Sequence, residues 1–346
     1  MRIESTPLGL YVLHYSLSEI TYSLVVNSAR KYLRKRDFLH YASQFVPRRI
    51  GSETWALAWA YIREVDDVID SPCNTSHRLE IIRNEWQVVQ EIKENIFTYR
   101  KPMPFRYFWL NQFIENLEKY YSSRERAEIW STIHDLYESA ILDARREGKV
   151  LSREFMYRLL EKKAVCFFKL YFLVGKLNLE KYLNEIAECL GLALGMLDDA
   201  LDILYDWKSG YINVTAEDLE ELGLSYDPRD REFIYRILKK KLLHKKSLEI
   251  LRLLFKARAL AWKLRNSIVR KLILRLSEIF AAPILEGRFI PGEKYFFKGG
   301  RLLLKILPEN EEAAYEIGHK LISLVLSVPQ ISPLLIKTWV RLIEKY

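Results

Sequence analysis

Cysteine is scarce in this chain of 346 residues, and its three copies lie far apart. Cys73, Cys166 and Cys189 form no Cys-x-x-Cys pair, so the sequence supports neither a disulfide framework nor a thiolate zinc site. Glycine and proline are also few, with 13 and 11 copies. Their scarcity disfavours a turn-rich sandwich or barrel and leaves room for long helices.

Long apolar runs are missing as well. The longest, around residues 164–174 and 321–328, are shorter than the ~20 residues that a membrane span needs, and charges or prolines flank them. The first residues lack the charged-then-apolar pattern of a signal peptide. Together with the scattered cysteines, these features predict a cytoplasmic protein that is soluble or membrane-associated as a peripheral protein.

The composition is otherwise globular, with 49% hydrophobic and 29% charged residues, which excludes a disordered chain. The formal net charge of +9 suits an anionic partner, either nucleic acid, a phosphorylated substrate or a membrane surface. No short basic recognition helix stands apart from the apolar pattern, so we expect no nucleic-acid partner. Aromatic residues, at 13%, are numerous enough to fill a large core.

Apolar residues recur at helical spacing along the chain, whereas alternating strand patterns are nearly absent. We expect helices over residues 17–33, 38–45, 52–70, 78–96, 105–121, 124–146, 153–174, 179–207, 229–243, 247–280, 311–326 and 334–344, and one strand candidate at 211–214. No linker or repeat divides the chain. The pattern predicts an all-α fold, with one helical domain over residues 1–290 and a C-terminal helical extension over 291–346 packed on it.

Acidic residues follow a helix that should be buried. The residues from Cys189 to Leu197 are apolar nearly all round, which is typical of a core helix. Asp198, Asp202 and Asp206 come next at i, i+4 and i+8, and therefore share one helix face. Desolvating such carboxylates is costly unless a partner is present. A cation is the simplest partner.

A second set of acids has the same spacing near the N-terminus. Asp66 and Asp70 are four residues apart, with Asp67 on the neighbouring flank. Ser71-Pro72 should end this helix just after Asp70, and Gly210 should end the other just after Asp206. Both clusters would then lie at helix C-termini, where the negative end of the dipole favours cations.

Carboxylates on two helix ends indicate a specific chemistry. Mg²⁺ prefers oxygen ligands and is usually held by one or two carboxylates together with substrate phosphates. Such a site could bind a diphosphate and neutralise the charge that develops as it leaves. An aromatic cavity would stabilise a carbocation, because ring faces attract positive charge. Either cluster alone would also fit a solvated face paired with Lys and Arg, but the two together favour metal binding.

The chain resembles the squalene and phytoene synthases, trans-isoprenyl diphosphate synthases of the head-to-head type. The run Arg63-Glu-Val-Asp66-Asp67-Val-Ile-Asp70 is similar to the first aspartate motif of that family, and residues 38–49 resemble its SFYLASRLLPRR segment. Residues 190–198 resemble its LGIALQLTN helix, which places Asp202 and Asp206 on the aspartates of the second motif. The run from Gly210 resembles the following GRIYLP. The resemblance extends from about residue 38 to 225.

The resemblance implies a large helical bundle of the isoprenoid synthase (class I terpenoid synthase) type with a central cavity. It implies Mg²⁺-dependent, head-to-head condensation of two prenyl diphosphates, farnesyl or geranylgeranyl, with release of diphosphate. The catalytic metal ligands would be Asp66, Asp70, Asp202 and Asp206, supported by Asp67 and Asp198. The substrate-binding residues would be Arg63, Lys163, Asp198 and Tyr211, of which Arg63, Lys163 and Tyr211 would hydrogen-bond the diphosphate. NADPH would be needed only in a reductive version, and no Gly-rich dinucleotide motif is present.

Departures from the family pattern leave the product open. Leu201 stands where the family has an Arg, and its small VAG.VG helix is replaced by residues 162–168. Lys163 instead resembles the KTA lysine of head-to-tail prenyl diphosphate synthases, and Asp198-Asp199-Ala-Leu-Asp202 resembles their DDxxD motif. The i, i+4, i+8 spacing also matches the metal triad of class I terpene cyclases. A non-catalytic helical assembly factor is the fourth alternative, and the oligomeric state stays open.

Other motifs carry weaker signals. His134-Asp135 is reminiscent of metal phosphohydrolases, and Glu316-x-x-His319 is half of a di-iron signature, but neither has supporting spacing elsewhere. The basic run over residues 30–36 fits a solvated helix face better than a diphosphate site. Residues 321–340 are apolar enough to pack as core or to rest on a membrane.

Overall fold

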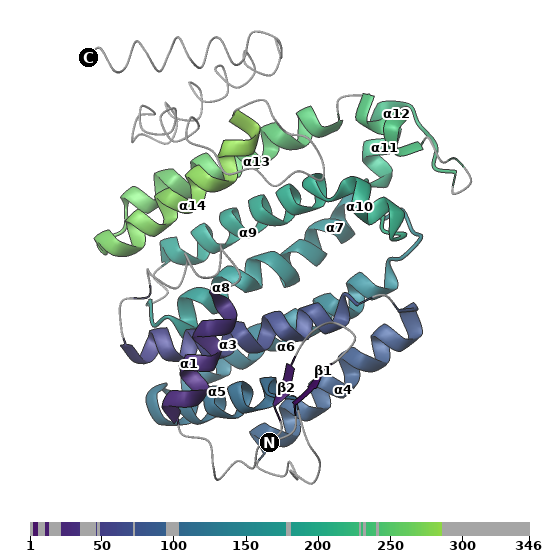
Figure 1. The fold of residues 1–346 in the computed structure, drawn as a ribbon. Coiled ribbons are helices and arrows are strands. Elements are labelled where there is room, and N and C mark those ends of the chain that lie inside the picture. Colours follow the sequence, from purple (N-terminus) through teal and green to yellow (C-terminus); the bar gives the residue numbers. More distant parts are fainter. Residues whose placement is uncertain are drawn as a thin grey trace. The chain divides into compact units, whose positions relative to one another are not determined.

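The computed structural model describes residues 3–5, 11–13, 22–34, 46, 49–71, 73–94, 104–177, 181–227, 230, 233–239 and 242–285. Within these residues, helices dominate and the strands form one antiparallel ribbon (Figure 1). The predicted all-α class is therefore confirmed. The helices predicted over 38–45, 311–326 and 334–344, and the extension predicted over 291–346, lie outside the described residues.

The chain forms two compact units, Met1–Tyr137 with Leu170–Asn178, and Glu138–Lys169 with Leu179–Tyr346. The first unit contains β1 (Ile3–Ser5), β2 (Tyr11–Leu13), α1 (Tyr22–Leu33), α3 (Arg49–Ile69), α4 (Thr75–Lys93), α5 (Arg106–Tyr120) and the start of α6 (Ser123–Arg145). Strand β1 pairs with β2 so that Ile3 lies opposite Leu13. The sequence did not predict this ribbon, because three-residue strands are too short to show a clear alternating pattern.

Helix α3 forms the core of the first unit. It packs against α1, α4 and α5, and its residues Trp55 and Trp59 are fully buried. The Trp55 ring centroid lies 5.8 Å from that of Trp59 and 5.7 Å from that of Tyr171. Such tilted and edge-on contacts stabilise beyond the area they bury. These buried aromatic contacts fix the position of α3, whose last turns carry the acidic residues.

A buried ion network ties α3 to its neighbours in the first unit. Arg106, at the start of α5, pairs with Glu85 of α4, and its Nη1 lies 3.6 Å from Glu64 Oε1 on α3. Tyr107 donates a hydrogen bond of 2.9 Å to Glu85. Both carboxylates are nearly inaccessible, so the Arg106 guanidinium offsets a large desolvation cost.

The second unit holds the remaining helices. They are the rest of α6, α7 (Arg153–Leu160), the π-helix η2 (Glu161–Val165), the start of α8 (Cys166–Val174), α9 (Lys181–Leu201), α10 (Ile203–Lys208), α11 (Ala216–Leu222), α12 (Phe233–Lys239), α13 (Leu242–Trp262) and α14 (Ser267–Leu285). Helix α9 packs against α7, η2, α13 and α14, and is therefore central to this unit.

Two glycines explain how closely α9 approaches η2. A Cβ atom on Gly191 would lie 2.5 Å from Val165 Cα, and one on Gly195 would lie 2.6 Å from Leu160 Cδ2. No larger residue fits at Gly191 without moving backbone. Gly191 thus allows backbone-to-backbone packing against η2, and Gly195 leaves room for the Leu160 side chain at the end of α7, just before the predicted aspartates begin.

Two predicted helices were wrong in being continuous. The helix predicted over 179–207 is interrupted at Asp202, whose φ and ψ of −93° and 4° leave the helical region. The helix predicted over 247–280 consists of α13 and α14, because the Asn266 side chain accepts hydrogen bonds from the N–H groups of Ile268 and Val269 and starts a new helix. The helix predicted over 229–243 lies partly outside the described residues, and its described parts belong to α12 and the start of α13.

The strand predicted over 211–214 is not formed, although the next residue, Thr215, makes an isolated bridge to Leu151. Thr215 instead caps α11 through a reciprocal pair of hydrogen bonds with Asp218. Helix α11 ends at Gly223, whose φ of 63° is left-handed.

Candidate active site

The first aspartate cluster lies at the C-terminal end of α3. Arg63, Asp66 and Asp67 are in its last two turns, and Asp70 follows directly, with its N–H bonded to the Asp66 carbonyl at 2.9 Å. Arg63 pairs with Asp66, and its Nη2 lies 3.4 Å from Asp67 Oδ1. The Tyr32 hydroxyl donates a 3.0 Å hydrogen bond to Asp67 Oδ2. The predicted residues of this cluster are therefore side by side.

One cation faces three acids in this cluster. Burial alone would lower the pKa of Arg63, but the three nearby aspartates outweigh it and raise the pKa above its ordinary value. The helix dipole adds negative potential at the same end of α3. The cluster therefore keeps a net negative field that a further cation would reduce.

The second aspartate cluster spans the junction of α9 and α10. Asp198 is exposed on α9, Asp202 lies at the interruption, and Asp206 is half-buried on α10. The N–H of Asp202 bonds to the Asp198 carbonyl at 2.9 Å, and that of Asp206 to the Asp202 carbonyl at 2.8 Å. The helical i to i+4 spacing thus persists across the interruption, so the three aspartates still follow one another at one-turn intervals.

Asp206 is positioned by Asn213, which is in turn bonded to Arg146, and the sequence predicted a role for neither residue. Asn213 donates a side-chain hydrogen bond to Asp206 Oδ2 and another, of 3.1 Å, to the Asp199 carbonyl. The buried Arg146 donates in turn to Asn213 Oδ1 at 2.7 Å and also pairs with Asp143. Arg146 follows the last residue of α6, and Asn213 lies beyond α10. The sequence offers no spacing that links them, because they are 67 residues apart.

The electrostatics of this cluster depend on burial. Burial raises the pKa of Asp206 to about 6, and the hydrogen bond from Asn213 and the charge of Arg146 only partly oppose this rise. Burial also raises the pKa of Asp199, although Arg146, Lys246 and Lys163 lower it. The site therefore contains carboxyls that are desolvated and incompletely neutralised by the protein's own cations.

The predicted diphosphate contacts Lys163 and Tyr211 join the same network. Lys163 lies in η2, and its Nζ is 3.6 Å from Asp143 Oδ2. The Arg146 guanidinium lies 4.9 Å from the centre of the Tyr211 ring. Short π-helical turns are frequent at functional sites. The structure thus brings Lys163 and Tyr211 close to Asp206 through Arg146 and its partner Asp143.

A cavity of about 310 Å³ opens within the second unit, beside this network. Its lining mixes apolar and charged side chains from α7, α9, α13 and the segment around α11: Arg153, Met156, Tyr157, Leu160, Met196, Asp199, Thr215, Asp218, Lys246, Glu249 and Arg252. None of the predicted site residues lines it, but Asp199 adjoins Asp198. Its charged side chains pair with one another, as Arg153 does with Asp218 at 3.3 Å.

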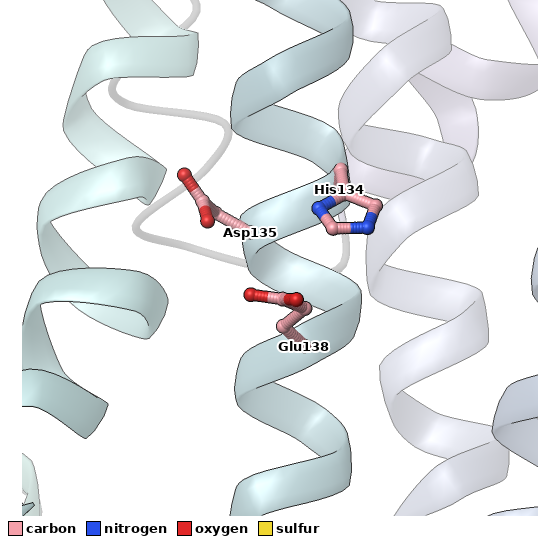
Figure 2. Close-up of side chains that lie close together, drawn as sticks. All are labelled: His134, Asp135 and Glu138. Atoms are coloured by element: carbon pink, nitrogen blue, oxygen red, sulfur yellow. The ribbon is translucent and has the colours of Figure 1, made fainter.

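A third group of potential metal ligands lies on one turn of α6. Figure 2 shows His134, Asp135 and Glu138, whose ligating atoms lie within 4.8 Å of one another. In the described part of the chain, neither predicted aspartate cluster forms such a group of three. Glu138 also pairs with Lys162. His134 is exposed, so this group fits a solvated helix face.

The donor set of the two aspartate clusters fits Mg²⁺. Every predicted ligand is a carboxylate, and hard cations prefer oxygen donors. Mg²⁺ retains several waters and binds substrate phosphates, so it does not require three converging carboxylates. The raised pKa of Asp206 also shows that a cation would relieve an existing electrostatic cost.

In the described residues, no helix has both the length and the apolar character of a membrane span.

Neither a protein-family model nor a curated protein matches the chain. The chain is, however, similar to solved structures. Squalene synthase HpnC from Alicyclobacillus acidocaldarius has a TM-score of 0.60 at 15% identity, over 78% of this chain and 96% of that one. A dehydrosqualene synthase in complex with a ligand has a TM-score of 0.60 at 11% identity, over 86% of this chain and 98% of that one. The chain therefore has the isoprenoid synthase fold of squalene and dehydrosqualene synthases, as the sequence predicted.

Proposed function

We propose that this protein is a Mg²⁺-dependent prenyltransferase that condenses two prenyl diphosphates head-to-head and releases diphosphate. The proposal depends chiefly on one observation: Asp198, Asp202 and Asp206 follow one another at one-turn intervals across the α9–α10 junction, on a fold shared with squalene and dehydrosqualene synthases. The cluster on α3 supplies a second set of carboxylates and Arg63.

The residues divide into metal ligands and diphosphate contacts. Asp66, Asp70, Asp202 and Asp206 would hold Mg²⁺, with Asp67 and Asp198 in support, and bound Mg²⁺ would neutralise charge on the departing diphosphate. Arg63, Lys163 and Tyr211 would donate hydrogen bonds to the diphosphate oxygens. Asn213 holds the Asp206 carboxylate, and Arg146 holds Asn213.

The reaction breaks the bond between C1 and the diphosphate oxygen of an allylic donor, and diphosphate leaves with the electron pair. The C=C of a second prenyl diphosphate attacks the resulting cation, and loss of a proton closes a cyclopropane ring in the joined chain. This cyclopropyl product keeps the second diphosphate, which leaves in a later ionisation. Farnesyl and geranylgeranyl diphosphate are the proposed substrates. NADPH would be consumed only if the cyclopropyl product is then reduced.

Two alternatives use the same residues. The exposed side chain of Lys163 and the Asp198-Asp199-Ala-Leu-Asp202 run favour a head-to-tail prenyl diphosphate synthase. The persistent one-turn spacing of Asp198, Asp202 and Asp206 equally favours a class I cyclase that acts on a single prenyl diphosphate.

A product assay distinguishes these reactions. The purified chain is incubated with farnesyl or geranylgeranyl diphosphate and Mg²⁺, with and without isopentenyl diphosphate and NADPH, and released diphosphate and lipids are identified. A doubled chain is the expected result. A cyclised or hydrolysed single chain would indicate the cyclase, and a five-carbon extension the head-to-tail synthase. No turnover and no Mg²⁺-dependent substrate binding would favour a helical assembly factor.

A further inference from the structure

One helical hairpin carries a basic segment that lacks acidic residues. Helices α13 and α14 pack against each other and are joined by the four residues 263–266 (Figure 1). Residues 250–277 contain no Asp or Glu and eight basic residues: Arg252, Lys256, Arg258, Lys263, Arg265, Arg270, Lys271 and Arg275. The formal net charge of this segment is therefore +8. Arg258 is buried, and the other seven basic residues are at least partly exposed.

Large apolar side chains are exposed at the tip of the same hairpin. Trp262 ends α13 with 36% of its surface exposed, and Ile268, in the first turn of α14, is 46% exposed. Among the described residues, the exposed large hydrophobics are these two and Tyr22, Leu24 and Tyr205. The hairpin tip therefore presents two of them within seven residues.

Basic side chains lie at the same tip, and one of them is close to Trp262. The Arg270 guanidinium lies 5.5 Å from the centre of the Trp262 ring, and Lys263 Nζ lies 5.7 Å from that of Tyr182, on α9. Arg265, in the turn, and Lys271, on α14, are exposed. The first acidic residue after the turn is Glu278, which pairs with Arg275 at 2.7 Å.

The turn between the helices is well anchored. Leu264, in the turn, and Val269, in the first turn of α14, are buried, and Asn266 caps α14. Trp262 and Ile268 therefore do not reach the surface through a loose loop. Their exposure follows from helices that are fixed to the core of the second unit by neighbouring side chains.

We propose that the tip of the α13–α14 hairpin, formed by Trp262, Lys263, Arg265, Ile268, Arg270 and Lys271, binds the surface of an anionic membrane. Trp is favoured at the membrane interface and Ile in the acyl region, while Lys and Arg attract acidic headgroups. A nucleic acid would use the cations but would gain nothing from an exposed Ile. The inference is independent of the proposed function, because no predicted site residue lies in this hairpin.

The test is co-sedimentation of the full chain with vesicles. Vesicles of phosphatidylcholine alone are compared with vesicles that also contain phosphatidylglycerol, at low and high salt. We expect binding to the anionic vesicles that weakens with salt. Lys263→Glu/Arg265→Glu should weaken this binding at least about 30-fold, since each cation near an anionic surface contributes a factor of about five. Ile268→Ser should weaken it about tenfold while the salt dependence persists.

The matched control is Arg83→Glu/Lys119→Glu, which changes the net charge equally at exposed positions of α4 and α5. It should bind like the unchanged protein, and circular dichroism should show equal helicity for all variants. Equal loss in the control and hairpin variants, or equal binding to both vesicle types, would overturn the proposal. So would binding to a DNA duplex that exceeds vesicle binding and that Ile268→Ser leaves unchanged.

Discussion

At the scale of single residues, Arg146 links the side chains around the second aspartate cluster. It is buried, pairs with Asp143, supports Asn213 and lies over the Tyr211 ring. Burial alone would lower the pKa of Arg146, but Asp143, Asp199 and Asp206 raise it. The aspartates could be predicted from their spacing along one helix. Arg146 could not, because its partners are brought to it only by the tertiary fold.

Arg146→Met should be among the most destabilising single substitutions in the second unit. It would leave the Asp143 carboxylate without its closest cation and Asn213 Oδ1 without the hydrogen bond from Arg146. The free energy of unfolding should fall by about 3–5 kcal/mol. Arg145→Met, at the exposed neighbouring position, should change the free energy of unfolding by less than about 0.5 kcal/mol. Urea denaturation of the two variants measures the difference. Equal effects would mean that Arg146 does not hold this network.

Asp206 should make the metal-free protein less stable as the pH rises. The pKa of Asp206 is about 6 in the folded protein and about 3.9 in the unfolded chain. The stability that this difference contributes is therefore fully present below about pH 4 and is lost as the pH rises through 6. Asp206→Asn should therefore be about 1–2 kcal/mol more stable than the unchanged protein at about pH 7.5, and equally stable near pH 4.

Denaturation in the presence of a chelator checks this prediction, and added Mg²⁺ provides its control. Mg²⁺ at neutral pH should stabilise the unchanged protein more than Asp206→Asn. A variant that is less stable than the unchanged protein at both pH values, with and without Mg²⁺, would contradict the role assigned to the buried charge.

At the scale of helices, α9 packs tightly at two glycines against η2 and the end of α7. Gly191→Ala places its Cβ against the Val165 backbone, whereas Gly195→Ala meets the end of the Leu160 side chain. We expect Gly191→Ala to lower the free energy of unfolding by about 2 kcal/mol. Gly195→Ala should cost less than about 1 kcal/mol, because Leu160 can move and alanine favours the helix. Thermal denaturation of both variants tests this, and a reversed order would refute the packing argument.

Helix existence was largely predictable, but helix interruptions were not. Apolar spacing identified the segments that became α3, α4, α5, α6 and α9, because each buries one face. The break between α13 and α14 depends on Asn266, whose capping hydrogen bonds compete with helix continuation. An Asn in the middle of a long apolar pattern is therefore a sequence signal for a helix break.

At the scale of the whole molecule, the two aspartate clusters belong to different compact units. If the proposed function is correct, Asp70→Asn and Asp202→Asn should each lower turnover at least about a hundredfold. The double variant should be little worse than the more severe single one, because residues that act as a unit are not additive. Steady-state release of diphosphate measures this.

Asp135→Asn is the control for these variants, since it removes a carboxylate of α6 outside both clusters. It should retain activity, and all variants should keep their helicity. Near-normal turnover of both single variants would contradict the metal ligands assigned to α3 and to the α9–α10 junction.

The π-helical turn Glu161–Val165 bears on how this chain should be compared with others. A π-turn holds one more residue than an α-turn, so every side chain after it is rotated by about 100° relative to an uninterrupted helix. Residues on α8 can therefore occupy positions that counting along a regular helix would assign to their neighbours. An alignment of this region by structure should need a one-residue gap near Val165, and a motif transferred across it by spacing alone would fall on the wrong face.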